Sequence, residues 1–177
     1  EQPTVIDKTI RSRIKDNMPD FSNENIDERI FEKCESISMI ACGTAMHAGL
    51  IGKHLIEKYC RVPVTVYMAS EYMYSDPIIS DKTLVVCVSQ SGETIDTLEA
   101  LKYAKSKGAM TLSIVNVRGS SIANASDNVI YTDAGPEIAV ASTKAYTTQV
   151  SIFYLITAKM AYLRGRMTEQ EVCELIK

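Results

Sequence analysis

The sequence predicts a three-layer α/β/α sandwich built on a five-stranded parallel sheet. Five short apolar runs alternate with helical patterns, and connections of this size imply parallel strands joined by right-handed crossovers. The runs are apolar on both faces, which is typical of strands that helices cover on each side. The length of 177 residues and the hydrophobic content of 46% suit one domain with a sizeable core.

Each expected strand is a short run rich in apolar and β-branched residues, bounded by turn or helix signals. The first run, "SISMIAC", is broken by Gly43, and the third, "TLVVCV", leads directly into a group of hydroxyl side chains. The five expected strands are residues 36–42, 62–68, 83–88, 110–116 and 128–132.

Helical periodicity fills the segments between these strands. Gly108 ends one such pattern, as glycine commonly does at a helix C-terminus. Thr168 and Glu171 have the spacing of a capping box at the start of a short terminal helix. Longer helices are expected at 45–59, 94–107 and 139–163, and short helical segments at 70–75 and 120–125. We expect the long apolar helix over 139–163 to pack in the core and to leave some surface for a partner.

Residues 1–35 differ from the rest and predict a helical N-terminal arm. Ile6, Ile10, Ile14 and Met18 are spaced by four, which predicts a single helix with one buried stripe. A second short helix is expected near residues 26–31. The arm carries more acidic than basic residues, so it lacks the positive face of a DNA-binding helix pair. The expected domains are therefore the arm (1–35), the α/β domain (36–165) and a C-terminal helix (166–177).

Composition excludes several classes of function. The net charge of -3 argues against a general polyanion binder, and nucleic acid is not an expected partner. No apolar run approaches the ~18 residues that cross a bilayer, and the first residues are too charged for a secretory signal, so a cytoplasmic location is expected.

The cysteines and histidines indicate neither a disulfide framework nor a metal site, and no cofactor is expected. We expect buried, reduced thiols. Cys42, beside a glycine turn, has an alternative role as a nucleophile, but no triad pattern accompanies it. The residues concerned are Cys34, Cys42, Cys60, Cys87, Cys173, His47 and His54.

The loop "SQSGET", residues 89–94, follows the third expected strand and leads into a helix. Ligands of parallel sheets bind beyond the carboxyl ends of the strands, where helix N-termini carry free N–H groups and partial positive charge. The loop adds the hydroxyls of Ser89, Ser91 and Thr94 and the amide of Gln90, while Gly92 permits close approach of the backbone. With no lysine or arginine, the loop predicts a neutral cradle for one phosphate group.

Simple helix capping is the alternative, but one cap accounts for only one hydroxyl. Neither a Walker loop nor a dinucleotide fingerprint occurs. Two other loops are expected at the same edge of the sheet, 42–45 and 135–144. By itself "CGTA" is better explained as a tight turn, and Glu137 and Lys144 as dipole partners or solvated charges, although Glu137 is also a candidate acid or base. Convergence of the three loops is the stronger argument for a site.

Four motifs then resemble a known family. "ACGT", "SQSGET", "GSSIA" and "AGPEIAVASTKAYTTQ" are similar, in order and spacing from about residue 36 to 161, to the sugar isomerase (SIS) domain, whose fold is flavodoxin-like or Rossmann-like. The last motif resembles in particular the first of the two SIS domains in the glutamine–fructose-6-phosphate aminotransferase family. The arm resembles the segment that joins the glutaminase domain of that family to its isomerase half.

The resemblance implies roles for individual residues. It places Ser89, Gln90, Ser91 and Thr94 on the phosphate of fructose 6-phosphate or glucosamine 6-phosphate. It places Thr44, Ala45 and Val140 on the sugar phosphate as well. Two positions depart from the family pattern: Ala45 stands where a serine is usual and keeps only its backbone N–H, and Met73 stands where an arginine is common.

The resemblance also implies partners outside these residues: a glutaminase domain, a second SIS domain and a second copy in a homodimer. In the family, the lysine, glutamate and histidine that carry the chemistry lie in or beyond the second domain, so this chain is expected to bind hexose phosphate without converting it. It would thus be a fragment of an enzyme of hexosamine biosynthesis. The alternatives are a sugar-phosphate-sensing regulatory domain and a stand-alone phosphosugar isomerase or deglycase.

Overall fold

The computed structural model describes residues 1–24, 26–137 and 142–176. Its main sheet has five strands in the order β4-β3-β5-β6-β7, and every neighbouring pair is parallel. The predicted fold class and all five predicted strands are confirmed. The strands are β3 (Ser36–Ala41), β4 (Val64–Met68), β5 (Thr83–Ser89), β6 (Met110–Val115) and β7 (Asn128–Tyr131).

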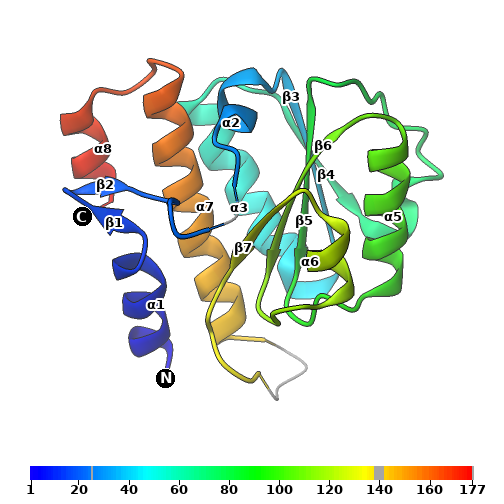
Figure 1. The fold of residues 1–177 in the computed structure, drawn as a ribbon, viewed down its shortest axis with the longest axis horizontal. Helices are drawn as coiled ribbons and strands as arrows, with labels where there is room; N and C mark the ends of the chain where they lie inside the picture. The colour runs from blue at the N-terminus through cyan, green and yellow to red at the C-terminus, as the bar shows by residue number, and fades with distance from the viewer. Residues whose placement is uncertain (25, 138–141, 177) are drawn as a thin grey trace.

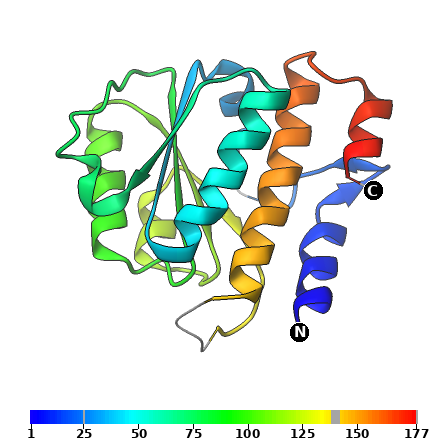
Figure 2. The same cartoon turned by 180° about the vertical axis from the view of Figure 1, so that it is seen from behind.

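Helices cover both faces of this sheet (Figures 1 and 2). Alternate side chains of β5 divide between the two resulting cores: Val86 packs with α3 and α7, and Cys87 packs on the α5 side. One face carries α3 (Gly43–Tyr59) and α7 (Lys144–Leu163). The other carries α4 (Ala69–Tyr72), α5 (Ile95–Ser106) and α6 (Ser121–Ala125).

The strand order contains a point at which the chain reverses its direction across the sheet. From β3 the chain crosses through α3 to β4 at one edge, whereas from β5 it crosses through α5 toward β6 and the other edge. The loops that leave β3 and β5 therefore diverge at their carboxyl ends. In open α/β sheets this divergence creates the crevice in which ligands bind.

The prediction of one helix through Met18 is wrong. Helix α1 (Gln2–Arg11) ends earlier, and the chain then forms a small hairpin of β1 (Ile14–Lys15) and β2 (Met18–Pro19). The two residues between these strands, Asp16 and Asn17, have φ of 52° and 61°. Asp and Asn tolerate this left-handed backbone, so a two-residue hairpin turn replaces the helix.

The arm is attached to the carboxyl end of β7 by buried polar contacts. The Arg13 guanidinium, 2% exposed, donates to the Thr9 carbonyl at 3.0 Å, to the Glu24 carboxylate and to the Tyr131 carbonyl. The Thr9 hydroxyl donates to the Thr132 carbonyl at 2.8 Å. The arm then continues through α2 (Arg29–Lys33), close to the predicted second helix.

The terminal helix α8 (Glu169–Leu175) begins with the predicted capping box. The Glu171 N–H donates to the Thr168 hydroxyl at 3.3 Å, and the Thr168 N–H donates to the Glu171 carboxylate at 2.7 Å. Figures 1 and 2 show α8, α1 and the hairpin lying together outside α7. These segments form a partial outer layer on that side.

All five cysteines are free, and the expectation of buried thiols holds for Cys34, Cys60 and Cys87. It is wrong for Cys42 and Cys173, which are partly exposed. Burial raises the pKa of the Cys87 thiol to about 12, which keeps it protonated and unreactive. Among the described residues, no group of histidine, cysteine and carboxylate side chains is placed to hold a metal, and no helix is long and apolar enough to cross a membrane.

Helices α3 and α7 meet closely at Gly52. A Cβ atom built on Gly52 would lie 2.6 Å from the Phe153 ring, closer than side-chain atoms can approach. Gly49, one turn earlier and also buried, has its nearest atom, on Val66, at an ordinary 3.6 Å. A side chain is therefore excluded at Gly52, whereas a methyl group can be accommodated at Gly49.

We expect Gly52→Ala to lower the free energy of unfolding by about 1–3 kcal/mol, because the added methyl overpacks the contact between α3 and α7. Gly49→Ala is the matched control, and we expect it to raise that free energy by up to about 1 kcal/mol through better helix propensity. Urea denaturation of both variants measures the difference. Equal effects of the two substitutions would contradict this account of the contact.

Candidate functional site

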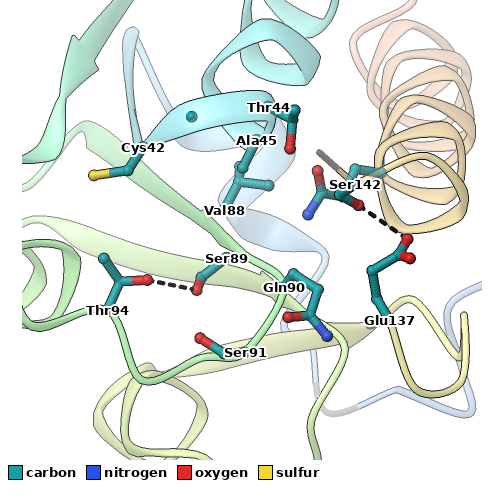
Figure 3. A pocket seen from close by; sticks show the side chains of 12 residues that line it. Cys42, Thr44, Ala45, Val88, Ser89, Gln90, Ser91, Thr94, Glu137 and Ser142 are labelled. Carbon is teal, nitrogen blue, oxygen red and sulfur yellow. Dashed lines mark hydrogen bonds between the residues drawn. The ribbon is translucent and has the colours of Figure 1, made fainter. Parts of the chain in front are cut away.

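Three segments converge on one cavity of about 270 Å³ at the carboxyl edge of the sheet (Figure 3). They are the turn after β3, the loop after β5, and the segment that leads into α7. The lining residues are Cys42, Gly43, Thr44, Ala45, Val88, Ser89, Gln90, Ser91, Thr94, Glu137, Ser142 and Gln149. The expected convergence of the three loops is thus present.

Hydrogen bonds within the loop after β5 fix its hydroxyl groups. The Gly92 N–H donates to the Ser89 hydroxyl at 3.0 Å, and the Glu93 N–H donates to the Ser91 hydroxyl at 3.2 Å. The Ser89 and Thr94 hydroxyls lie 3.2 Å apart, as the dashed line in Figure 3 marks. A hydroxyl that accepts a backbone hydrogen bond keeps its own O–H, so Ser91 retains a donor for a ligand.

The same loop is held against the connection between β6 and α6. Gly92 has φ of +67°, and a Cβ at this position would lie 2.0 Å from the Ser120 hydroxyl. The Gly92 carbonyl accepts from the Ile122 N–H at 2.9 Å, and the Gln90 carbonyl accepts from the Asn116 N–H at 3.1 Å. Glycine is required here by both backbone conformation and space.

Carboxylates of the chain itself occupy two helix N-termini near the cavity. Glu93 accepts from the Ser121 N–H at 2.8 Å and from the Ser121 hydroxyl at 2.6 Å, at the start of α6. Glu137 accepts from the Ser142 hydroxyl at 3.2 Å and from the N–H groups of Thr143 and Ala145 at 3.3 and 3.4 Å, at the start of α7. Both pairings place negative charge at the positive end of a helix dipole.

The N-termini of α3 and α5 differ from these. Neither N-cap residue, Cys42 nor Thr94, makes a capping hydrogen bond with its side chain. Asp96 in the first turn of α5 is exposed and is not a lining residue. In the described part of the chain, no side chain accepts from the first amides of either helix. Two helix N-termini without a carboxylate partner therefore border the same cavity, which makes its floor attractive to an anion.

Two interpretations of Glu137 were possible from the sequence, a helix-dipole partner or a catalytic acid or base, and the structure favours the first. Glu137 is a lining residue, but its carboxylate caps α7. Lys144 forms an ion pair of 2.9 Å with Glu1 and is not among the lining residues. The lining contains no lysine or arginine among the described residues. Anion attraction here must come from amides and hydroxyls.

The structure brings most of the predicted site residues together. Those that line the cavity are Thr44, Ala45, Ser89, Gln90, Ser91 and Thr94. Val140 lies outside the described residues. Met73 directly follows α4 and is not a lining residue. Sequence reasoning missed Ser142 and Gln149. A glutamine within an otherwise apolar helix is the one sequence signal that could have indicated Gln149.

Comparison with known proteins identifies the family of this chain. The model of the SIS domain family matches residues 30–159, and the chain therefore belongs to the SIS domain family. Residues 36–159, which hold the sheet and most of α7, fall inside the match.

Two relatives with close sequence similarity to this chain have the same name. A glutamine–fructose-6-phosphate aminotransferase [isomerizing] of Caldanaerobacter subterraneus is 50% identical over 99% of this chain, and one of Clostridium tetani is 51% identical over 99%. The chain spans 29% of the length of each. The C-terminal domain of glucosamine-fructose-6-phosphate aminotransferase from Francisella tularensis matches with a TM-score of 0.93 and 40% identity, covering 98% of this chain and 49% of that one.

The Ser121 contacts hold the pKa of the Glu93 carboxyl below its ordinary value. A carboxyl with a lowered pKa in the folded state stabilises the loop above its unfolded pKa, and this stabilisation is lost as the pH falls through the folded value. We expect Ser121→Ala to raise the Glu93 pKa toward its ordinary value, measured by NMR titration of the carboxyl carbon.

Ser106→Ala is the matched control, because this exposed hydroxyl at the far end of α5 bonds only the Tyr103 carbonyl among the described residues. It should leave the Glu93 titration unchanged. A Glu93 midpoint that stays in place in Ser121→Ala would show that the hydroxyl does not stabilise the carboxylate.

Proposed function

We propose that the cavity binds the phosphate group of a hexose 6-phosphate. The observation that carries the proposal is the pair of long helices, α3 and α5, whose N-termini border one cavity and have no carboxylate partner among the described residues. The chain supplies carboxylates to α6 and α7 but leaves α3 and α5 to an external anion. A phosphate monoester supplies that charge together with oxygens that accept from several donors.

The size and chemistry of the lining favour a small polar ligand. Drug-sized ligands occupy pockets of about 300–1,000 Å³, so a cavity of about 270 Å³ suits a smaller molecule such as a sugar phosphate. We assign the phosphate to Ser89, Gln90, Ser91 and Thr94, as the family resemblance implies. Thr44, the backbone N–H of Ala45, and Val140 are assigned to the remainder of the sugar phosphate.

The names of the relatives support a particular sugar. Both aminotransferases are named for fructose 6-phosphate, and their identity to this chain is about one half over almost all of its residues. We propose fructose 6-phosphate as the ligand and glucosamine 6-phosphate as its product in the whole protein. That activity belongs to hexosamine biosynthesis.

We further propose that this chain is the first of two SIS domains in such an enzyme. It spans 29% of the curated relatives and 49% of the Francisella C-terminal domain, which leaves room for a second domain of similar size and for a glutaminase domain. The proposed boundaries are the arm at 1–35, the SIS domain at 36–165 and the C-terminal helix at 166–177. Leu50, Ile51 and Tyr154, exposed on α3 and α7, offer apolar surface for that domain or for a second copy in a homodimer.

Calorimetric titration tests the ligand. We expect fructose 6-phosphate to bind and free fructose to bind far more weakly, because the helix N-termini act on the phosphate. Ser91→Ala should weaken fructose 6-phosphate binding by about 10- to 100-fold, the equivalent of one hydrogen bond to a charged group. Ser106→Ala, an exposed serine outside the cavity, should bind as the parent does. Equal binding of fructose and its phosphate would refute the phosphate cradle.

Turnover by the 177-residue chain alone is a separate test. Isomerisation and amino transfer require groups that move protons, and the one charged residue of the described lining, Glu137, is held as a helix cap. We expect no formation of glucose 6-phosphate or glucosamine 6-phosphate from fructose 6-phosphate and ammonia, assayed by chromatography of the sugar phosphates. Measurable product would contradict the placement of the catalytic residues outside this chain.

A further inference from the structure

Gln149 is a lining residue to which the proposed phosphate site gives no role. It lies in the second turn of α7 and is 2% exposed. Its side-chain oxygen, Oε1, has no hydrogen-bond partner among the described residues. A buried amide oxygen without a partner is costly, so a glutamine kept in this state needs an explanation.

The surroundings of Gln149 do not require a polar side chain. Its neighbours Ala145 and Ile152 and Phe153 are buried in the core between α7 and the sheet. The nearby Thr148 hydroxyl is satisfied locally by the Ala145 carbonyl at 2.9 Å. An apolar residue at this position would suit the helix, so packing alone does not account for the carboxamide.

The cavity is the feature that sets Gln149 apart from other buried polar groups. Several other buried polar atoms of the described chain also lack partners, including the hydroxyls of Thr157 and Ser113. None of those residues lines the cavity, whereas Gln149 does. Gln149 thus combines a buried, unsatisfied side-chain oxygen with a place in the cavity lining.

Gln149 belongs to the α7 side of the cavity. Figure 3 shows Glu137 and Ser142 on this side and Thr94 and Ser91 on the other, where α5 begins. For a ligand anchored by its phosphate at α5, the α3 turn and the α7 side are the walls that face its remaining groups. In a sugar phosphate these groups are hydroxyls.

We propose that the Gln149 carboxamide binds a hydroxyl of the sugar, accepting its O–H at Oε1, and so selects a sugar phosphate over a phosphate without hydroxyls. This inference rests on the proposed function. Its physical basis is that a site built to hydrogen-bond a hydroxyl rejects a ligand that lacks it, because the buried polar group is then left unpaired.

Gln149→Met tests the assignment, since methionine has a similar length and helix propensity but offers no amide. In calorimetric titrations we expect this variant to bind fructose 6-phosphate at least about 10-fold more weakly than the parent, the effect of about one lost hydrogen bond. Binding of inorganic phosphate should stay within about twofold, because phosphate does not reach α7. The melting temperature of the free variant should rise, since a buried unpaired oxygen is removed.

Thr157→Val is the matched control on the same helix. Thr157 is fully buried, its hydroxyl has no partner among the described residues, and it is not a lining residue. We expect the substitution to raise the melting temperature and to leave the affinities for both ligands unchanged. It therefore separates the removal of a buried polar atom from the loss of a ligand contact.

Each other outcome overturns the inference in a distinct way. If the parent binds fructose 6-phosphate and Gln149→Met binds it equally well, Gln149 does not contact the sugar, and the phosphate cradle stands. A parallel loss for phosphate and fructose 6-phosphate, or a fall in melting temperature, would assign Gln149 a structural role. If the parent binds neither ligand, the proposed function fails and the inference fails with it.

Discussion

The parallel pairing of β3 with β5 is the constraint on which the rest of the structure depends. Their register, from Ser36 opposite Thr83 to Ala41 opposite Val88, brings the ends of both strands to the same edge of the sheet. Because the chain leaves these two strands in opposite directions, α3 and α5 begin beside each other and then separate. The cavity is the space between their N-termini, and its location follows from strand order rather than from any single side chain.

Charge placement around that edge then decides what the cavity can attract. Glutamates neutralise the N-termini of α6 and α7, and no cationic side chain lines the cavity in the described part of the chain. The attraction for an anion is therefore made of fixed backbone dipoles, which need no reorganisation and do not titrate. Such a site selects charge through geometry. Under the function proposed above, the hydroxyls and the amide of Gln149 are the groups that distinguish one phosphate ester from another.

The sequence predicts much of this arrangement because its strongest patterns are local. The strands expected from the β-branched runs, the helix end at Gly108 and the Thr168–Glu171 capping box are confirmed, and the polar loop 89–94 lies at the expected edge of the sheet. The sequence pattern extends the N-terminal helix too far, because the four-residue spacing of Ile14 and Met18 hides the turn at Asp16 and Asn17. The sequence pattern does not single out Gln149, because its importance depends on which face of α7 borders the cavity, and tertiary packing decides that.

The contact between Gly92 and Ser120 has a consequence for protein engineering. The shape of the loop depends on a neighbour 28 positions further along the chain, whose side chain fills the space that a Cβ at position 92 would take. A graft of the six loop residues onto another parallel sheet would therefore carry the hydroxyls without the surface that holds them. A transplantable unit must include the connection from β6 to α6, and positions 92 and 120 must be chosen together.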